Sequence, residues 1–234
     1  MKLTTKYRKT CYLCPCLKRK NMKLIILDFD GTLGDTRELI VKTMQQTIDA
    51  LGLEARTDEQ CAAMIGLPLK QAFTDLIPMS GETGDLCVST YRRIFSENNA
   101  SYTVPAFPNV IDTLHRLADE GYVLTIASSR SRSSLLDFIH TMQLEHIILY
   151  VLGADDVTKA KPHPEPVLKT LETFGCKPED AWVVGDTVYD IEMDRRAGAR
   201  TCGVTYGNGS RQELQEAGAD FIIDDFGEML ALLS

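Results

Sequence analysis

The chain has 234 residues, of which 44% are hydrophobic and 25% are charged. This composition excludes a mainly disordered protein, and the length suffices for one large core or for a core with a smaller inserted unit. No apolar run approaches the roughly 20 residues that a membrane-spanning helix needs, so we do not expect an integral membrane protein.

The net charge of −8 is spread unevenly along the chain. The first 21 residues carry seven Lys and Arg residues and no acid, and the remaining 18 basic and 33 acidic residues leave a net charge of −15 from Met22 onward. An acidic body disfavours general nucleic-acid binding, which depends on Lys and Arg residues that neutralise phosphates. A small anionic substrate would need local cations, a metal ion or backbone amides around it.

Three of the seven cysteines, Cys11, Cys14 and Cys16, cluster near the N-terminus. Such a cluster can bind a metal ion, but no matching second cluster follows it. The other cysteines are scattered singly among apolar residues, which is typical of a reduced, cytoplasmic protein. Because residues 1–21 also lack the apolar stretch of a secretory signal, we expect them to form a disordered extension.

Short, almost continuously apolar runs recur from Met22 onward, as expected for parallel strands that are covered on both faces. They lie at 23–28, 122–127, 147–152, 182–184, 201–204 and 221–223. Between the later runs, helical patterns lie at 108–120, 131–141, 164–175, 188–197 and 210–218. This alternation predicts an α/β fold with a doubly wound, Rossmann-like parallel sheet.

About 90 residues separate the first two apolar runs, which is too long for a single crossover between neighbouring strands. Helical patterns fill this interval at 36–51, 57–65, 68–77 and 84–98. We therefore expect a small helical cap domain, residues 37–102, inserted into an α/β catalytic core of residues 22–36 and 103–234.

The ligand crevice of such a sheet lies beyond the carboxyl ends of its strands, so the residues just after each apolar run are the candidates. The first run ends in Asp28-Phe-Asp30-Gly-Thr. Two carboxylates this close repel each other unless a cation neutralises them, and the pair therefore points to bound Mg²⁺. The alternative is a plain Asp-Gly turn that closes the strand.

The second and third runs lead to candidate phosphate-binding groups. Ser128 follows the second run, where a hydroxyl and backbone amides at a helix N-terminus can bind an anion or cap the helix. Lys161 lies in the stiff loop Lys-Pro-His-Pro. It is either a fixed positive charge for a phosphate or an ordinary solvated lysine.

The fourth run ends in Gly185-Asp-Thr-Val-Tyr-Asp190. We expect Asp186 at the strand end and Asp190 on the same face of the first turn of the next helix. These acids can simply be negative charges that the dipole of the helix stabilises near its N-terminus. Across the crevice from Asp28 and Asp30, however, they suggest a site for a hard cation with oxygen ligands.

Taken together and in this order, these residues resemble the motifs of the haloacid dehalogenase superfamily, in its phosphatase branch. The residues that match its four motifs are Asp28-Phe-Asp-Gly-Thr-Leu33, Ser128, Lys161 and Gly185-Asp-x-x-x-Asp190. The likeness extends from Met22 to the C-terminus and includes Tyr206-Gly-x-Gly-Ser210. The helical insertion is similar to the C1 cap of that family, and the whole chain is most similar to the phosphoglycolate phosphatase group.

This resemblance implies covalent catalysis on a small phosphorylated metabolite. Asp28 would attack phosphorus to form an aspartyl-phosphate. Asp30 would protonate the leaving alcohol and then activate the water that attacks the intermediate. Ser128 and Lys161 would hold the phosphoryl oxygens.

The resemblance also implies Mg²⁺ as the cofactor. Its ligands would be Asp28, the backbone carbonyl of Asp30, and Asp186. Asp190 would orient Lys161 or a metal-bound water. The cap would close over the substrate and exclude bulk water.

Two positions depart from the pattern of this family. Ser129-Arg130 replaces the Asn-Lys pair that commonly follows the second-motif hydroxyl, and Gly34 replaces a larger residue that faces the active site. The change at Gly34 predicts a pocket wider than a small acid such as glycolate requires.

Two alternatives stay open at this point. A β-phosphoglucomutase-like phosphosugar mutase would form the same aspartyl-phosphate, although Thr32 favours a phosphatase because similar mutases often carry Val there. A non-catalytic phosphoacceptor module would be only about half this length, and it would need neither a cap nor Asp30. We expect a cytoplasmic enzyme without nucleic-acid or membrane partners, whose substrate and oligomeric state the sequence leaves open.

Overall fold

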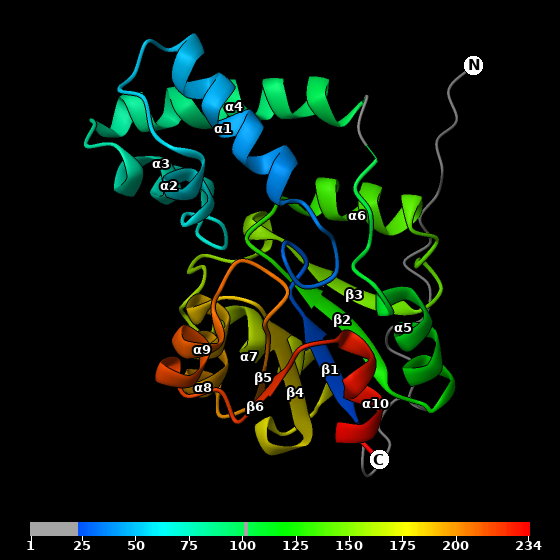
Figure 1. Ribbon diagram of the computed structural model, residues 1–234. Coiled ribbons are helices and arrows are strands. Elements are labelled where there is room, and N and C mark those ends of the chain that lie inside the picture. The colour runs from blue at the N-terminus through cyan, green and yellow to red at the C-terminus, as the bar shows by residue number, and fades with distance from the viewer. Residues whose placement is uncertain (1–22, 101–102) are drawn as a thin grey trace.

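The computed structural model describes residues 23–100 and 103–234, and its centre is a six-stranded sheet (Figure 1). The strands are β1 (Leu24–Leu27), β2 (Val123–Ala127), β3 (Ile148–Leu152), β4 (Ala181–Gly185), β5 (Arg200–Val204) and β6 (Phe221–Ile223). They lie in the order β3-β2-β1-β4-β5-β6, and every neighbouring pair is parallel. The strand order reverses at β1, which confirms the predicted doubly wound α/β fold.

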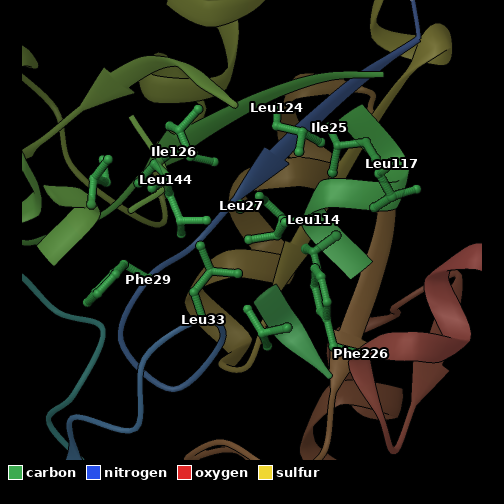
Figure 2. Packing of buried hydrophobic residues seen from close by; sticks show 14 of the residues in the cluster. Ile25, Leu27, Phe29, Leu33, Leu114, Leu117, Leu124, Ile126, Leu144 and Phe226 are labelled. Carbon is green, nitrogen blue, oxygen red and sulfur yellow. The ribbon is translucent and has the colours of Figure 1, made fainter. Parts of the chain in front are cut away.

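Helices cover both faces of this sheet. They are α5 (Val110–Asp119), α6 (Arg132–Thr141), α7 (Glu165–Phe174), α8 (Val188–Ala197), α9 (Arg211–Ala217) and α10 (Met229–Leu232). Successive side chains of a strand point to opposite faces. Accordingly, Ile25 and Leu27 of β1 pack with residues of α5 and α6, as Figure 2 shows for Leu114 and Leu117 of α5. Leu24 and Ile26 pack with residues of α7 and α8 on the other face.

Four helices lie between β1 and β2 in the sequence and stand apart from the layers of the sheet (Figure 1). They are α1 (Arg37–Ala50), α2 (Asp58–Ala62), α3 (Leu69–Leu76) and α4 (Gly81–Asn99). They have a hydrophobic cluster of their own, which includes Met44 and Ile48 of α1, Phe73 of α3, and Cys87 of α4. The structure therefore shows a helical insertion in the α/β core, as the sequence predicts.

Two inserted helices differ from the predicted ranges. The helix expected at 84–98 begins at Gly81, because the Ser80 hydroxyl accepts a hydrogen bond from the Thr83 amide and caps the first turn. The helix expected at 57–65 is the short α2, which ends at Ala62 and is followed by turns. The C-terminal helix α10 was not predicted from the sequence.

Some predictions fall outside the described residues. The extension 1–21 and its cysteines Cys11, Cys14 and Cys16 lie there, as do residues 101 and 102 at the end of the expected cap domain, so the boundaries 37–102 stay a prediction. Within residues 23–100 and 103–234, no helix combines the length and the apolar character needed to cross a membrane.

Candidate active site

The chain turns sharply after β1, at the carboxyl edge of the sheet. The Asp28 amide donates to the Val184 carbonyl of β4 at 2.9 Å, which keeps Asp28 in line with the strand. The Phe29 carbonyl then accepts from the Gly34 amide at 2.9 Å and closes the turn. Gly31, at the tip, has a φ of +86°, a left-handed conformation that glycine adopts without strain. The turn thus leaves the Asp28 side chain at the strand end.

A buried group of charges forms around Lys161. Its Nζ lies 2.5 Å from Asp28 Oδ1 and 2.6 Å from Asp190 Oδ1, and none of the three side chains is more than 5% exposed. Asp190 lies in the first turn of α8, and its Oδ2 accepts from the amide and the hydroxyl of Thr187 at 3.0 and 2.7 Å. Lys161 is therefore held in place, and the alternative of a solvated lysine is wrong.

Asp186, at the end of β4, completes this group of acids. Its carboxylate is fully buried and accepts hydrogen bonds from the amide of Asn208 at 2.7 Å, from the Asn208 side chain at 2.9 Å and from the Thr32 hydroxyl at 3.3 Å. One carboxylate oxygen each from Asp28, Asp186 and Asp190 lies within 4.8 Å of the others. Carboxylate oxygens are the ligands that Mg²⁺ and Ca²⁺ prefer, so this group fits a hard cation.

The charges of this group do not cancel. Three carboxylates face one ammonium group, which leaves two negative charges in excess. Burial, which the charge of Lys161 only partly offsets, raises the pKa of Asp28 to about 7. Burial also raises the pKa of Asp186, with further contributions from Asp190 and Asp28. A divalent cation would balance the excess charge and favour the ionised carboxylates.

Lys161 itself stays charged in this environment. Burial works against its positive charge, but Asp190 and Asp28 outweigh burial and raise the Lys161 pKa above its ordinary value. A positive charge fixed beside Asp28 is what a transferring phosphoryl group requires.

Asp30 points away from this group and toward Arg130. The Nη2 atom of Arg130 lies 2.5 Å from Asp30 Oδ1, and its Nε lies 3.2 and 3.1 Å from the two carboxylate oxygens. The Asp30 carboxylate is thus not among the clustered acids. The metal role that the resemblance gives Asp30 uses its backbone carbonyl, and it stays a prediction.

Ser128 lies beside the Asp28 turn, directly after the end of the neighbouring strand β2. Leu27 pairs with Ile126 in the register of β1 and β2, so the two strand ends meet at the same edge of the sheet. Ser128 is 7% exposed. The alternative that it caps the next helix is wrong, because α6 begins at Arg132 and its N-cap is Ser131.

A cavity of about 750 Å³ separates the strand ends from the helical insertion. Asp30, Ser129 and Arg130 line it on the side of the core. The insertion contributes a mostly apolar wall, which includes Ile40, Met44, Ile65, Leu67, Tyr91 and Phe95. The Ser129 hydroxyl donates to the Gly66 carbonyl at 2.6 Å and so joins core and insertion directly.

The prediction that Gly34 widens the pocket is wrong. A Cβ at Gly34 would lie 3.0 Å from the Phe29 ring and 3.3 Å from Val104, and Gly34 does not line the cavity. Its small size allows close packing beneath the site instead.

Sequence reasoning missed the role of Asn208, which makes two hydrogen bonds to Asp186. The available signal was the pair of glycines that flank it. A Cβ at Gly207 would lie 2.3 Å from the Gly31 carbonyl, and one at Gly209 would lie 2.3 Å from the Asp186 carbonyl. Glycines on both sides of a polar residue mark a loop that approaches another backbone closely.

Comparison with known proteins places these features in a family. The profile of the haloacid dehalogenase-like hydrolases matches residues 25–204. Pyrophosphatase PpaX of Anoxybacillus flavithermus is 32% identical over 213 residues, which cover 91% of this chain and 97% of that protein. "Probable phosphatase IndB" of Dickeya dadantii is 33% identical over 210 residues, which cover 88% of this chain and 91% of that protein.

Solved structures agree with this placement. A haloacid dehalogenase-like family hydrolase from Streptococcus pneumoniae has a TM-score of 0.81 at 26% identity, and the match covers 92% of this chain and 100% of that one. A predicted phosphoglycolate phosphatase from Haemophilus somnus shares the fold, with a TM-score of 0.82 at 24% identity over 92% of this chain and 99% of that one. The chain therefore belongs to the haloacid dehalogenase-like hydrolase family and is an enzyme of its phosphatase branch.

Proposed function

We propose that the protein is a Mg²⁺-dependent phosphomonoester hydrolase that acts on a small phosphorylated metabolite through an aspartyl-phosphate on Asp28. The observation that carries this proposal is the buried pair of Lys161 and Asp28, 2.5 Å apart, next to Asp186. This arrangement offers a carboxylate nucleophile, a fixed positive charge and an acidic group suited to a cation.

In the first step, an oxygen of Asp28 attacks phosphorus, and the bond between phosphorus and the leaving oxygen breaks. Lys161 and the Ser128 hydroxyl hold the phosphoryl oxygens. Asp30 gives a proton to the leaving oxygen, which takes the electron pair of the broken bond. In the second step, Asp30 takes a proton from water, the water attacks phosphorus, and Asp28 is released as a carboxylate.

The residues present fit Mg²⁺. Asp28, Asp186 and the Asp30 carbonyl would hold the ion, and both Asp190 oxygens are already occupied by Lys161 and Thr187. When bound, the ion supplies charge that offsets the repulsion between the phosphoryl group and the acids. Asp190 acts in support by orienting Lys161.

The insertion α1–α4 acts as a cap in this proposal. Its apolar wall faces the cavity across from Asp30, and the bond between Ser129 and Gly66 ties it to the core. Closure of the cap would exclude bulk water from the aspartyl-phosphate and leave only the attacking water.

The names of the relatives point to small, anionic substrates. Pyrophosphatase PpaX is named for pyrophosphate, and three structures of the same fold are described as "predicted" or "putative" phosphoglycolate phosphatases. We take phosphoglycolate and pyrophosphate as the first compounds to test. A phosphosugar mutase would share the first step, and it would return the phosphoryl group to a sugar hydroxyl instead of water. The scattered cysteines favour the cytoplasm as the location.

The test is phosphate release from phosphoglycolate, pyrophosphate and a sugar phosphate, with and without Mg²⁺. We expect Mg²⁺-dependent release by the wild type, and loss of release in Asp28→Asn and Asp30→Asn. Asp49→Asn, an exposed acid on α1, is the matched control and should retain activity. Isomerisation of the sugar phosphate without release of phosphate would favour the mutase.

Metal binding is measured separately from turnover. We expect Mg²⁺ to raise the melting temperature of the wild type and to have little effect on Asp186→Asn, which removes one negative charge from the cluster. An equal shift in both proteins would contradict the proposed metal site.

A further inference from the structure

Arg130 is a buried cation in the wall of the cavity, next to the proposed acid. Its side chain is 8% exposed, and its carboxylate partner is Asp30. The guanidinium lies over the rings of Phe95 and Phe138, 4.8 and 5.0 Å from their centroids. Nη1 donates to the Ser134 hydroxyl at 3.2 Å. Arg130 therefore has a fixed orientation, with two of its nitrogens directed at Asp30.

This pairing does not suit the proposed role of Asp30. Both of its carboxylate oxygens accept hydrogen bonds from Arg130. An acid held in this way cannot deliver a proton to a leaving oxygen until the pair opens. Opening it without replacement would leave the buried guanidinium unpaired, which is costly.

The other cations that line the cavity are placed differently. Lys70 is 46% exposed at its side chain and pairs with Asp85 at 2.7 Å, and Arg92 is exposed on α4. Asp30, Asp85 and Asp137 also line the cavity, so an anion that entered it would meet negative charge. Arg130 is thus the buried positive charge in this wall, among the described residues.

We propose that Arg130 is a specificity-determining residue that binds a negative charge carried by the leaving group of the substrate. This inference rests on the proposed function and names the class of substrate: a phosphate compound whose leaving group has its own carboxylate or phosphate. Arg130 lies within one hydrogen bond of Asp30, and Asp30 must contact the leaving oxygen. A charge a few bonds beyond that oxygen is therefore within reach of the guanidinium.

Binding then becomes an exchange of partners. The Nε and Nη2 donors of Arg130 leave the Asp30 oxygens and pair with the carboxylate or phosphate of the leaving group. Arg130 stays neutralised throughout, and Asp30, released from the guanidinium, takes a proton from solvent water and gives it to the leaving oxygen. A substrate with a neutral leaving group cannot replace Asp30 as the partner of Arg130, so it should react more slowly.

The test compares phosphoglycolate with phosphoglycolamide, in which a neutral amide replaces the carboxylate. Both release an alcohol, so both need the proton from Asp30. We expect the wild type to favour phosphoglycolate in kcat/KM, and Arg130→Gln to lose about 10- to 100-fold more on phosphoglycolate than on phosphoglycolamide, as expected for a lost charge-assisted hydrogen bond. Arg130→Lys keeps the charge and should retain part of the preference.

Arg132→Gln is the matched control, because Arg132 lies two residues away, is 43% exposed and pairs with Asp156. It should change neither substrate's kcat/KM. Equal losses on both substrates in Arg130→Gln would overturn the proposal and leave Arg130 as a residue that only positions Asp30; no loss on either would also overturn it. If the wild type turned over neither these compounds nor pyrophosphate, the proposed function itself would fail, and the assignment of Arg130 with it.

Discussion

The two sides of the cavity are built in opposite ways. On the side of the core, charged residues are buried and satisfied by one another, as in the pair of Asp30 and Arg130 that lines the cavity. On the side of the insertion, the wall is mostly apolar, and its helices are held together by a separate hydrophobic cluster. The core thus fixes the groups that act on the phosphoryl group, whereas the insertion shapes the space for the rest of the substrate.

This difference has a physical cause. A buried charge needs partners at fixed distances, and strand ends joined by parallel pairing provide them. An apolar wall needs only shape and volume, which short helices can supply with many different sequences. Substitutions in the core should therefore change the reaction or the stability strongly, and substitutions in the apolar wall should change mainly substrate preference.

The largest effect is expected for Lys161→Met. Removing the ammonium leaves Asp28 and Asp190 buried without their partner, which should lower the free energy of unfolding by about 3–5 kcal/mol and reduce phosphate release by at least about 1000-fold. Urea denaturation and a phosphate-release assay measure the two effects. Lys159→Met, an exposed neighbour in the same loop, is the control and should change neither. Equal stability and equal phosphate release in the two variants would show that Asp28 and Asp190 do not depend on the charge of Lys161.

The next effect concerns Gly31. A Cβ there would lie 2.1 Å from Asp186 Oδ2 and 2.4 Å from Asn208 Nδ2, so Gly31→Ala should displace Asp186. We expect phosphate release to fall by roughly 100-fold, in the range of losses seen when a catalytic group is misplaced by about 1 Å.

Gly121→Ala separates this clash from backbone strain. Gly121 has the same φ of +86° as Gly31, but nothing lies within 4 Å of its Cβ position. Both variants should lose about 1–2 kcal/mol of stability from the left-handed conformation, and only Gly31→Ala should lose activity. Equal activities would mean that the close approach of Gly31 to Asp186 has no role in the site.

Asp194 tests whether buried acids of the core must be paired. It is fully buried on α8, and neither of its carboxylate oxygens has a hydrogen-bond partner. Burial raises its pKa well above 3.8, with a further contribution from Asp190. Asp194→Ala should therefore increase the free energy of unfolding by about 1–3 kcal/mol at neutral pH, because an unpaired buried polar group is removed.

The raised pKa of Asp194 also makes the stability of the protein depend on pH. Because its pKa is higher in the folded state than in the unfolded state, folding takes up a proton between the two values. The contribution of Asp194 to the free energy of unfolding is greatest below pH 3.8, and it is lost as the pH rises toward the raised pKa. The advantage of Asp194→Ala over the wild type should thus grow as pH rises through this window, as measured by urea denaturation. Asp194→Asn, which cannot ionise, should show the same growing advantage. A constant difference across pH would contradict the burial of a titrating acid.

The smallest effect is expected in the apolar wall. Val88 of α4 lines the cavity and is half-buried, so Val88→Ala should change KM by about two- to tenfold, since roughly one or two methylene groups of contact are lost. Steady-state kinetics should show little change in kcat. Leu86→Ala, on the same helix and 52% exposed, should have no effect on either constant. A large loss of kcat in Val88→Ala would show that the wall takes part in the chemistry.

The sequence by itself determined the fold class and the chain order of the candidate residues. Continuous apolar runs at β1 and β4 predicted strands buried on both faces, and the acids that follow them had to meet at one edge because the strands are parallel. Asp28 and Asp186 could be selected in this way, since a strand end places each of them through local geometry alone. Lys161 lies in the loop between β3 and α7, and it was selected for the prolines that restrict this loop. The helical spacing of the long interval likewise predicted an insertion.

Only the tertiary structure decided which partners these residues have. The contact of Arg130 with Asp30 joins residues that are 100 positions apart, and that of Asn208 with Asp186 crosses between two loops. The packing of Gly34 against Phe29, and the lack of a partner for Asp194, depend on neighbours from several elements. The pattern of apolar residues along one segment indicates which of its faces is buried. Contacts between distant segments depend on how the layers pack, and no single segment encodes that packing.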